Sequence, residues 1–348
     1  MQLAYTFQPE AITLWETIVA KSMTELATSI KQFASLNRAP GATWTDATKR
    51  RAPHKPILLL AVLDLVHRNV ITSPFIAVTG DLMELNELFN LYWRRIVPLG
   101  QTSSIAFPFS HLDRESFWEL IPQPGTTITP AIINNTSSVT YLRKHALGAK
   151  LDEGLFRVMR SGEGRGILRE ALLQACFSAE AAAVLREQSV INREAFDYSR
   201  MLEEKAHLPL VQEILEVDNY RSVARDQGFR RIVVKAYDHR CALCGVRIIT
   251  PEQHTVVDAA HIVPWCKSQN DDIRNGIALC KLCHWAFDEG MMGVSDSYAV
   301  ITSRQIAADP NVPGFLLTLS GRTIIPPSDR DLWPAQQYLV EHRRAWRL

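Results

Sequence analysis

Residues 280–290 read CKLCHWAFDEG, and this stretch carries two kinds of metal-binding side chain in close succession. Cys280 and Cys283 form a Cys-x-x-Cys pair, and such a pair can grip one tetrahedral Zn²⁺ from a tight turn. His284 follows directly, and Asp288 stands four residues beyond it. Residues four apart share one face of a helix, so His284 and Asp288 can bind the same ion. The stretch therefore predicts two distinct metal positions rather than one crowded site.

A second Cys-x-x-Cys pair stands in YDHRCALCGVRI, separated from the first by residues 245–279. Four of the six cysteines fall into these pairs, which points to metal binding rather than to disulfides in a reducing compartment. We expect one structural Zn²⁺ held by Cys241, Cys244, Cys280 and Cys283. The alternative is four reduced core cysteines, and the remaining Cys176 and Cys266 are expected to be buried apolar side chains.

The segment between the pairs contains a spaced set of polar residues. His261 follows an apolar, strand-like run, Asn275 stands in a turn-like RNG, and His284 stands where a helix should begin. This pattern, with the phrases AHIVPW and CH-x-x-FD-x-G, resembles the HNH nuclease family, whose core is a ββα-metal finger. The resemblance covers about residues 225–305. It implies a metal-dependent endodeoxyribonuclease that leaves a 5′-phosphate and a 3′-hydroxyl.

The resemblance also implies roles for the catalytic set His261, Asn275 and His284. A neutral His261 suits the general base that activates water, because imidazole titrates near neutral pH. His284 and Asp288 would hold Mg²⁺ or Mn²⁺, which suit oxygen-rich sites completed by water and phosphate. Asn275 is expected to brace its loop rather than to touch the metal. The alternatives for these residues are a satisfied core histidine at position 261 and an inactive domain kept for DNA binding.

One position departs from the family pattern. Many HNH enzymes place an Asp or His ligand directly before the base, where this chain has Ala260. Strand alternation puts Asp258 on the same face as Ala260, so Asp258 is a conceivable substitute. Otherwise the site uses fewer protein ligands and more water.

Basic residues around Cys241 and Cys244 outnumber acidic ones. Residues 225–247 hold six Lys or Arg residues against Asp226 and Asp238. We expect phosphate contacts from this segment, with Arg230 and Arg231 as the chosen candidates. The alternative is a solvated helix face.

The whole chain has 348 residues, 47% of them apolar, which fits two or three domains with sizeable cores. The net charge of +1 gives no global preference for an anionic partner. The N-terminus shows no signal peptide, and the apolar run near residues 57–63 is shorter than the ~20 residues that span a bilayer. We therefore expect a soluble cytoplasmic protein without a membrane partner.

The N-terminal half carries a second resemblance. Several short stretches are similar to the DNA sulfur-binding domain that precedes HNH nucleases in type IV restriction enzymes. They are RAPHKPILLLAVLDL, LFNLYW, AFPFSHL with FWEL, GLFRVM and LREALLQACF. The resemblance implies an apolar pocket of Phe107, Pro108 and His111 for a soft phosphorothioate sulfur. Arg51, His54 and Lys55, near a helix N-terminus, would hold the phosphate charge. The family often has Tyr-Pro where this chain has Phe107-Pro108, and a small residue near the position of His111. The bulkier His111 would shrink the pocket or shift its preference to another mark.

Local patterns place the remaining elements. We expect a buried helix over 57–66, a helix over 82–97, extended segments over 105–112 and 116–121, a loop over 122–140 and helices over 141–180. The α+β chain would comprise a mostly helical DNA-recognition domain (1–178), a helical linker (179–219) and an HNH domain with its zinc site (220–348).

Together these patterns predict a type IV-like restriction endonuclease that cleaves modified, phosphorothioated double-stranded DNA. A homodimer would be the simplest way to cut both strands. The alternatives are an HNH endonuclease that reads an unmodified or base-modified site and a non-catalytic zinc protein that binds DNA.

Overall fold

A computed structural model describes residues 9–78, 82–98, 100–210, 221–250, 253–304, 306 and 314–348. The chain divides between Ser189 and Val190 into two compact units, here named the N-terminal unit and the C-terminal unit. The division falls inside the long helix α9 (Ala179–Ala206), which occupies most of the expected linker. Residues 211–219 of that linker, and the expected start of the HNH domain at Tyr220, lie outside the described residues.

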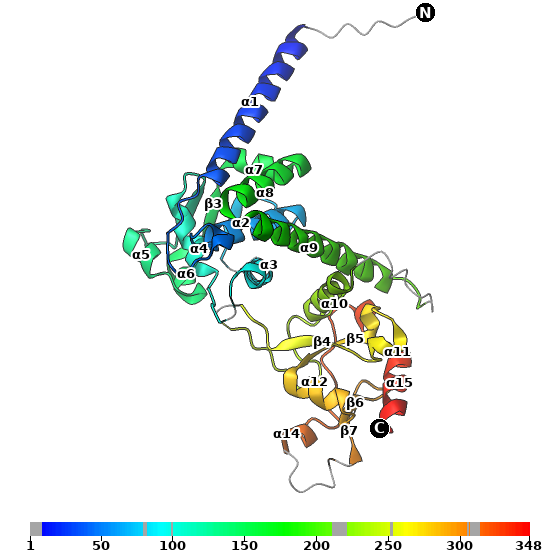
Figure 1. Ribbon diagram of the computed structural model, residues 1–348. Coiled ribbons are helices and arrows are strands. Elements are labelled where there is room, and N and C mark those ends of the chain that lie inside the picture. The colour runs from blue at the N-terminus through cyan, green and yellow to red at the C-terminus, as the bar shows by residue number, and fades with distance from the viewer. Residues whose placement is uncertain are drawn as a thin grey trace, which may run out of the picture. The chain divides into compact units, whose positions relative to one another are not determined.

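A fully buried helix forms the centre of the N-terminal unit (Figure 1). Every residue of α2 (His54–His67) from Lys55 to Val66 is buried, as its apolar sequence on all sides predicts. The other described elements are α1 (Pro9–Ala34), η1 (Asp46–Thr48), α3 (Leu82–Ile96), α4 (Ala106–His111), η2 (Leu112–Arg114), α5 (Pro130–Asn135), α6 (Val139–His145), α7 (Glu153–Arg160) and α8 (Gly162–Cys176). Among the described residues, no helix has both the length and the apolar character needed to cross a membrane.

A three-stranded antiparallel sheet completes this unit, in the order β1 (Phe75–Ala77), β3 (Ala146–Leu151), β2 (Trp118–Pro122). The expected helix over 146–151 is wrong, because this segment is the central strand of the sheet. Gly148 pairs with Ala77 and Ile121, and a Cβ at Gly148 would lie 2.3 Å from the Ile76 carbonyl oxygen. The absent side chain lets the strands approach, and this pairing outweighs the local helical pattern.

Two further local expectations are corrected. Residues 105–112 do not form an extended segment, because α4 and η2 place Ile105, Phe109 and Leu112 in the core at helical spacing. Within the expected loop over 122–140, residues 130–135 form α5. Its Thr129 side chain caps the helix by accepting a hydrogen bond from the Ile132 amide.

The C-terminal unit contains the ββα arrangement expected from its sequence. Strands β4 (Val257–His261) and β5 (Gly276–Cys280) pair antiparallel, with His261 opposite Gly276, and α12 (Lys281–Asp288) follows directly. The other described elements are α10 (Ser222–Ala236), α11 (Trp265–Ser268), η4 (Ile273–Asn275), β6 (Met292–Val294), β7 (Val300–Thr302), α14 (Gly314–Leu317), η5 (Arg330–Leu332) and α15 (Gln336–Trp346). The α+β class is confirmed.

Candidate active site

The hairpin and α12 bring three expected site residues to one cavity. His261 ends β4, whereas His284 and Asp288 lie one turn apart on α12. All three line a cavity of about 340 Å³ in the C-terminal unit. The wall also contains side chains that the sequence did not single out, namely Trp265, Lys267, Glu341, His342 and Trp346.

His284 and Asp288 form a pair that fits a divalent cation. The His284 Nε2 and Asp288 Oδ2 atoms are 3.3 Å apart. Two atoms at this separation can both lie ~2.1 Å from one ion. Partial burial raises the pKa of Asp288, and the neighbouring His284 opposes that rise. The His284 nitrogen and an Asp288 carboxylate oxygen therefore lie side by side on one face of α12, as their spacing predicts.

No third protein ligand stands beside this pair in the described part of the chain, where only the four cysteines form a group of at least three potential ligands. Asp258 does not replace the family ligand that is missing at Ala260. Its carboxylate lies 2.8 Å from the Arg230 guanidinium, whereas Ala259 and His261 line the cavity from the alternate positions of β4. A cation bound by this pair would leave its other coordination positions to water and phosphate oxygens.

The two expected phosphate-binding arginines are engaged within the chain. Arg230 pairs with Asp258, and Arg231 donates to the Ser199 hydroxyl at 3.0 Å while lying over the Phe196 ring. Neither arginine lines the 340 Å³ cavity, whereas Lys267 does. Both arginines thus have partners that a count of charges does not reveal, although only Arg230 is paired with a carboxylate.

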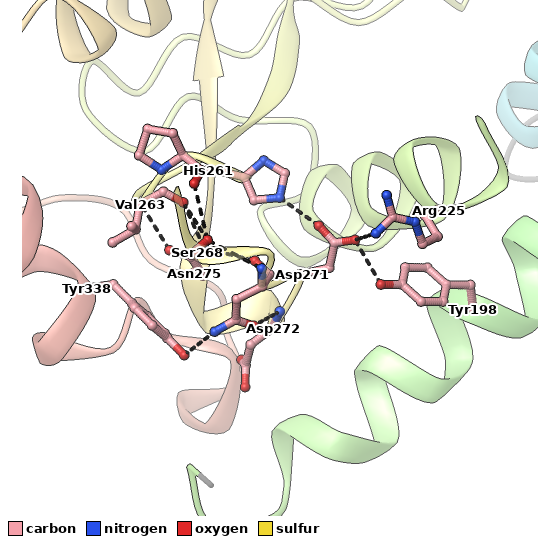
Figure 2. Close-up of polar contacts among 11 residues, drawn as sticks. Tyr198, Arg225, His261, Val263, Ser268, Asp271, Asp272, Asn275 and Tyr338 are labelled. Atoms are coloured by element: carbon pink, nitrogen blue, oxygen red, sulfur yellow. Dashed lines mark hydrogen bonds and ion pairs between the residues drawn. The ribbon is translucent and has the colours of Figure 1, made fainter. Parts of the chain in front are cut away.

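His261 is held from two sides. Its Nε2 atom lies 2.7 Å from Asp271 Oδ1 (Figure 2). Its ring stacks on Phe229 with centroids 4.0 Å apart and planes at 5°. Asp271 is 3% exposed and was not singled out from the sequence. The only sequence signal was an acidic residue in the loop between the hairpin strands.

Asn275 lies beneath the same loop with no exposed surface. Its Oδ1 accepts a hydrogen bond from the Val263 amide at 2.9 Å. Its Nδ2 donates to the carbonyl oxygens of Val263 at 3.1 Å and Asn270 at 3.0 Å (Figure 2). These bonds use both ends of the amide to tie the loop after β4 to the start of β5.

The four paired cysteines meet in a separate cluster. The Sγ atoms of Cys241, Cys244, Cys280 and Cys283 all lie within 4.8 Å of one another and could hold a metal ion. Hydrogen bonds within the cluster lower the pKa of Cys241 and Cys280 and raise the pKa of Cys244 and Cys283. Cys266, in contrast to the expectation, is exposed.

The N-terminal unit has a smaller cavity of about 130 Å³ at the expected recognition residues. His54, Lys55, Phe107 and His111 line it, whereas Arg51 and Pro108 do not. The Phe107 and His111 rings lie in tilted contact with centroids 4.1 Å apart and planes at 32°, and His54 meets Phe107 edge-on at 5.0 Å. Burial lowers the pKa of His54 to about 4, so this imidazole is neutral at pH 7.

Positive charge around this cavity is distributed differently from the expectation. The Lys55 ammonium forms a close ion pair with Glu115, and burial lowers its pKa. Arg51 donates to the Arg38 carbonyl oxygen instead of facing the cavity. Arg38 and Arg114, which the sequence did not single out, both line the cavity. Arg38 donates to the carbonyl oxygens of Thr48 and Cys176, and Arg114 donates to the Asn134 side chain.

Comparisons with known proteins agree with the ββα geometry. The family model described as HNH endonuclease matches residues 241–295, a segment that contains His261, His284 and all four clustered cysteines. No curated protein matches the chain. A solved structure titled "Modification dependent TagI restriction endonuclease" is similar at 21% identity with a TM-score of 0.26, over 34% of this chain and 36% of that one. The chain thus matches about a third of that protein's length. Residues 241–295 of this chain's C-terminal unit match the HNH endonuclease family model.

Proposed function

We propose that the protein is a restriction-type endonuclease that hydrolyses phosphodiester bonds of modified double-stranded DNA. The observation that carries the proposal is the single cavity lined by His261, His284 and Asp288 inside the segment that the HNH family model matches. A base and a pair of cation ligands are the two components that phosphodiester hydrolysis needs.

His261 acts as the general base in this mechanism. Its imidazole accepts a proton from a water molecule as the water oxygen attacks phosphorus. The bond from phosphorus to O3′ breaks, O3′ takes a proton from solvent, and the products are a 5′-phosphate and a 3′-hydroxyl. A Mg²⁺ or Mn²⁺ ion bound by His284 and Asp288 would supply positive charge beside the phosphate and the leaving oxygen. Lys267 on the cavity wall adds a fixed cation for the DNA backbone.

The cation ligands are tested by His284→Ala and Asp288→Ala. Both variants should lose cleavage, and both should need a higher Mn²⁺ concentration for any residual activity. Lys281→Ala is the matched control, because Lys281 lies on the same helix, is exposed and does not line the cavity. Cleavage by both ligand variants at the rate of this control would contradict the assignment.

The cysteine cluster serves as a structural Zn²⁺ site in this proposal. A closed site of four thiolates leaves no position for substrate, so its role is to hold the scaffold. Cys280 ends β5 and Cys283 lies in the first turn of α12, directly before His284. A zinc ion bound here would fix the start of the helix that presents the catalytic cation ligands.

The N-terminal unit selects the DNA in this proposal, with phosphorothioate as the favoured mark. The cavity is small, about 130 Å³, which is compatible with a phosphate-sized group. The Phe107 ring offers an apolar wall for sulfur, and Arg38 and Arg114 lie beside it for the phosphate charge.

Binding of matched duplexes tests this selection. A duplex with one phosphorothioate should bind more tightly than its unmodified counterpart, and Phe107→Ala should reduce the difference. Equal affinity for the two duplexes would rule out sulfur reading. Preference for a base-methylated duplex would instead support a nuclease that reads a modified base with the aromatic wall of His54, Phe107 and His111.

A further inference from the structure

We propose that Asp271 is a positioning residue, which fixes the tautomer and orientation of His261 so that the Nδ1 atom serves as the base. The proposal rests on the function proposed above, in which His261 activates water. It adds a residue that the loop sequence does not mark, and it assigns the reacting nitrogen.

The contact between the two side chains determines the tautomer. An ionised carboxylate can only accept hydrogen bonds. Because Asp271 Oδ1 lies 2.7 Å from His261 Nε2, the hydrogen must be on Nε2. The Nδ1 atom then keeps its lone pair, and it has no hydrogen-bond partner in the described part of the chain. A neutral imidazole with a free Nδ1 is the form that can take a proton from water.

The ring is also fixed against rotation. Phe229 of α10, itself 3% exposed, stacks on the His261 ring at 4.0 Å with an angle of 5°. The hydrogen bond defines the direction of the ring edge, and the stacking defines its plane. Together they leave His261 one orientation, with its exposed part on the cavity wall.

Asp271 is itself held as a charged acceptor. The Tyr198 hydroxyl of α9 donates to Asp271 Oδ2 at 2.8 Å, and the Arg225 guanidinium lies 3.8 Å from the same oxygen (Figure 2). Arg225 also lies over the Trp265 ring at 4.1 Å. A buried carboxylate is costly unless it is paired, and here both oxygens have partners. These contacts hold the carboxylate in place beside His261.

The exposed fractions of the two side chains indicate that Asp271 positions His261 rather than forming an ion pair that only stabilises the fold. The Asp271 side chain is 4% exposed, whereas the His261 side chain is 22% exposed and lines the cavity. Asp271 thus contacts neither the cavity nor a substrate placed in it, and it can act only through His261. A carboxylate that orients a base from its far nitrogen is a general device in acid–base catalysis.

The kinetic test uses Asp271→Asn, Tyr198→Phe and a matched control. The amide introduced by Asp271→Asn can present its N–H donors to Nε2 and so favour the other tautomer, a change that can lower turnover by ~10⁴-fold in other base–carboxylate pairs. We expect kcat to fall by ~10²–10⁴-fold without a change in DNA affinity, and Tyr198→Phe to lower kcat by roughly tenfold. The control is Asp331→Asn, which breaks the exposed His207–Asp331 pair of the same unit and should leave kcat unchanged.

Nitrogen-15 spectra of labelled histidine give a readout that is independent of cleavage. The His261 signals, assigned by their loss in His261→Gln, should show the hydrogen on Nε2 in the wild-type protein and a mixture in Asp271→Asn. If Asp271→Asn fails to fold in a thermal melt, Tyr198→Phe carries the kinetic test, because it keeps the carboxylate on Nε2 and removes only one of the bonds that hold the carboxylate. Wild-type kcat in both variants and an unchanged tautomer in Asp271→Asn, beside an inactive His261→Ala, would overturn the positioning role and leave the nuclease intact. Full cleavage by His261→Ala would instead overturn the proposed function.

Discussion

Replacing Asn275 with Asp separates a bracing role from a metal-binding role. The change is almost isosteric, but it turns the Nδ2 donor group into a second acceptor. In the structure Nδ2 donates to the carbonyl oxygens of Val263 and Asn270. Asn275→Asp would therefore place a carboxylate oxygen against two carbonyl oxygens in a fully buried position.

The cost follows from the bonds that are lost. Two hydrogen bonds disappear, and each buried acceptor left without a donor costs about 1–3 kcal/mol. The Val263 carbonyl oxygen retains a hydrogen bond from the Ser268 hydroxyl at 3.3 Å, which reduces the free-energy cost at this one of the two acceptors. We therefore expect the free energy of unfolding of the C-terminal unit to fall by about 4 kcal/mol. For a unit of this size the melting temperature should drop by ~8–16 °C.

Thermal melts and cleavage rates of Asn275→Asp give the decisive comparison. Gln269→Glu is the control, since it makes the same amide-to-carboxylate change at an exposed position of the same loop. A bracing role predicts that Asn275→Asp loses stability and activity while Gln269→Glu keeps both. If Asn275→Asp keeps its melting temperature and cleaves as well as the wild type, Asn275 acts as a cation ligand, which a carboxylate can replace.

Three further results are expected. Cys280→Ser should lose bound zinc, measured by atomic absorption, and should unfold the C-terminal unit, because structural zinc contributes ~10–16 kcal/mol; retained zinc and cooperative melting would disprove the site. Burial lowers the pKa of His54 from 6.5 to about 4, so the unfolded chain binds a proton at a higher pH than the folded chain does. The free energy of unfolding should therefore fall by up to ~3 kcal/mol as the pH is lowered from 6.5 to 4. Urea titrations of His54→Phe should show a flatter pH dependence, and an unchanged one would refute this. Gly290→Ala should destabilise by ~1–3 kcal/mol in urea, because φ is 66° and its Cβ would lie 2.3 Å from the Trp346 ring; unchanged unfolding would be inconsistent with this packing.

The contact between His284 and Asp288 and the turn within each cysteine pair could be predicted because their geometry is local. A Cys-x-x-Cys turn and an i,i+4 pair on a helix depend on a few residues, so spacing alone places Cys283, His284 and Asp288. The structure adds that one short helix, α12, carries both kinds of ligand. The fully buried α2 was predictable for a similar reason, since it is apolar on every face.

The support of His261 could not be predicted, because it comes from distant segments. The loop offers two adjacent acids, and only the fold shows that Asp271 turns inward while Asp272 caps η4 and pairs with Arg274. Tyr198 and Arg225 reach Asp271 from separate helices. Sequence spacing contains no information about which helix covers which loop.

Short elements and surface charges were misjudged for the same physical reason. The strand β3 depends on close approach at Gly148, which is a tertiary contact rather than a local preference. The sequence around Cys241 and Cys244 does not show which cations are paired, yet Arg230 pairs with Asp258 and Arg247 pairs with Asp238. Lys55 likewise has Glu115 as its partner from a distant turn. Pairing depends on the fold, and composition does not record it.

Single-turnover cleavage by the wild-type protein and by His261→Ala tests the central claim most directly. The substrates are phosphorothioated, base-methylated and unmodified duplexes with Mg²⁺ or Mn²⁺, and DNA binding is measured in parallel. The account predicts that the wild type cleaves modified DNA to 5′-phosphate ends, and that His261→Ala binds equally well but cleaves ~10²–10⁴-fold more slowly. Cleavage by His261→Ala at the wild-type rate, or no cleavage of any duplex by the wild type, would contradict it.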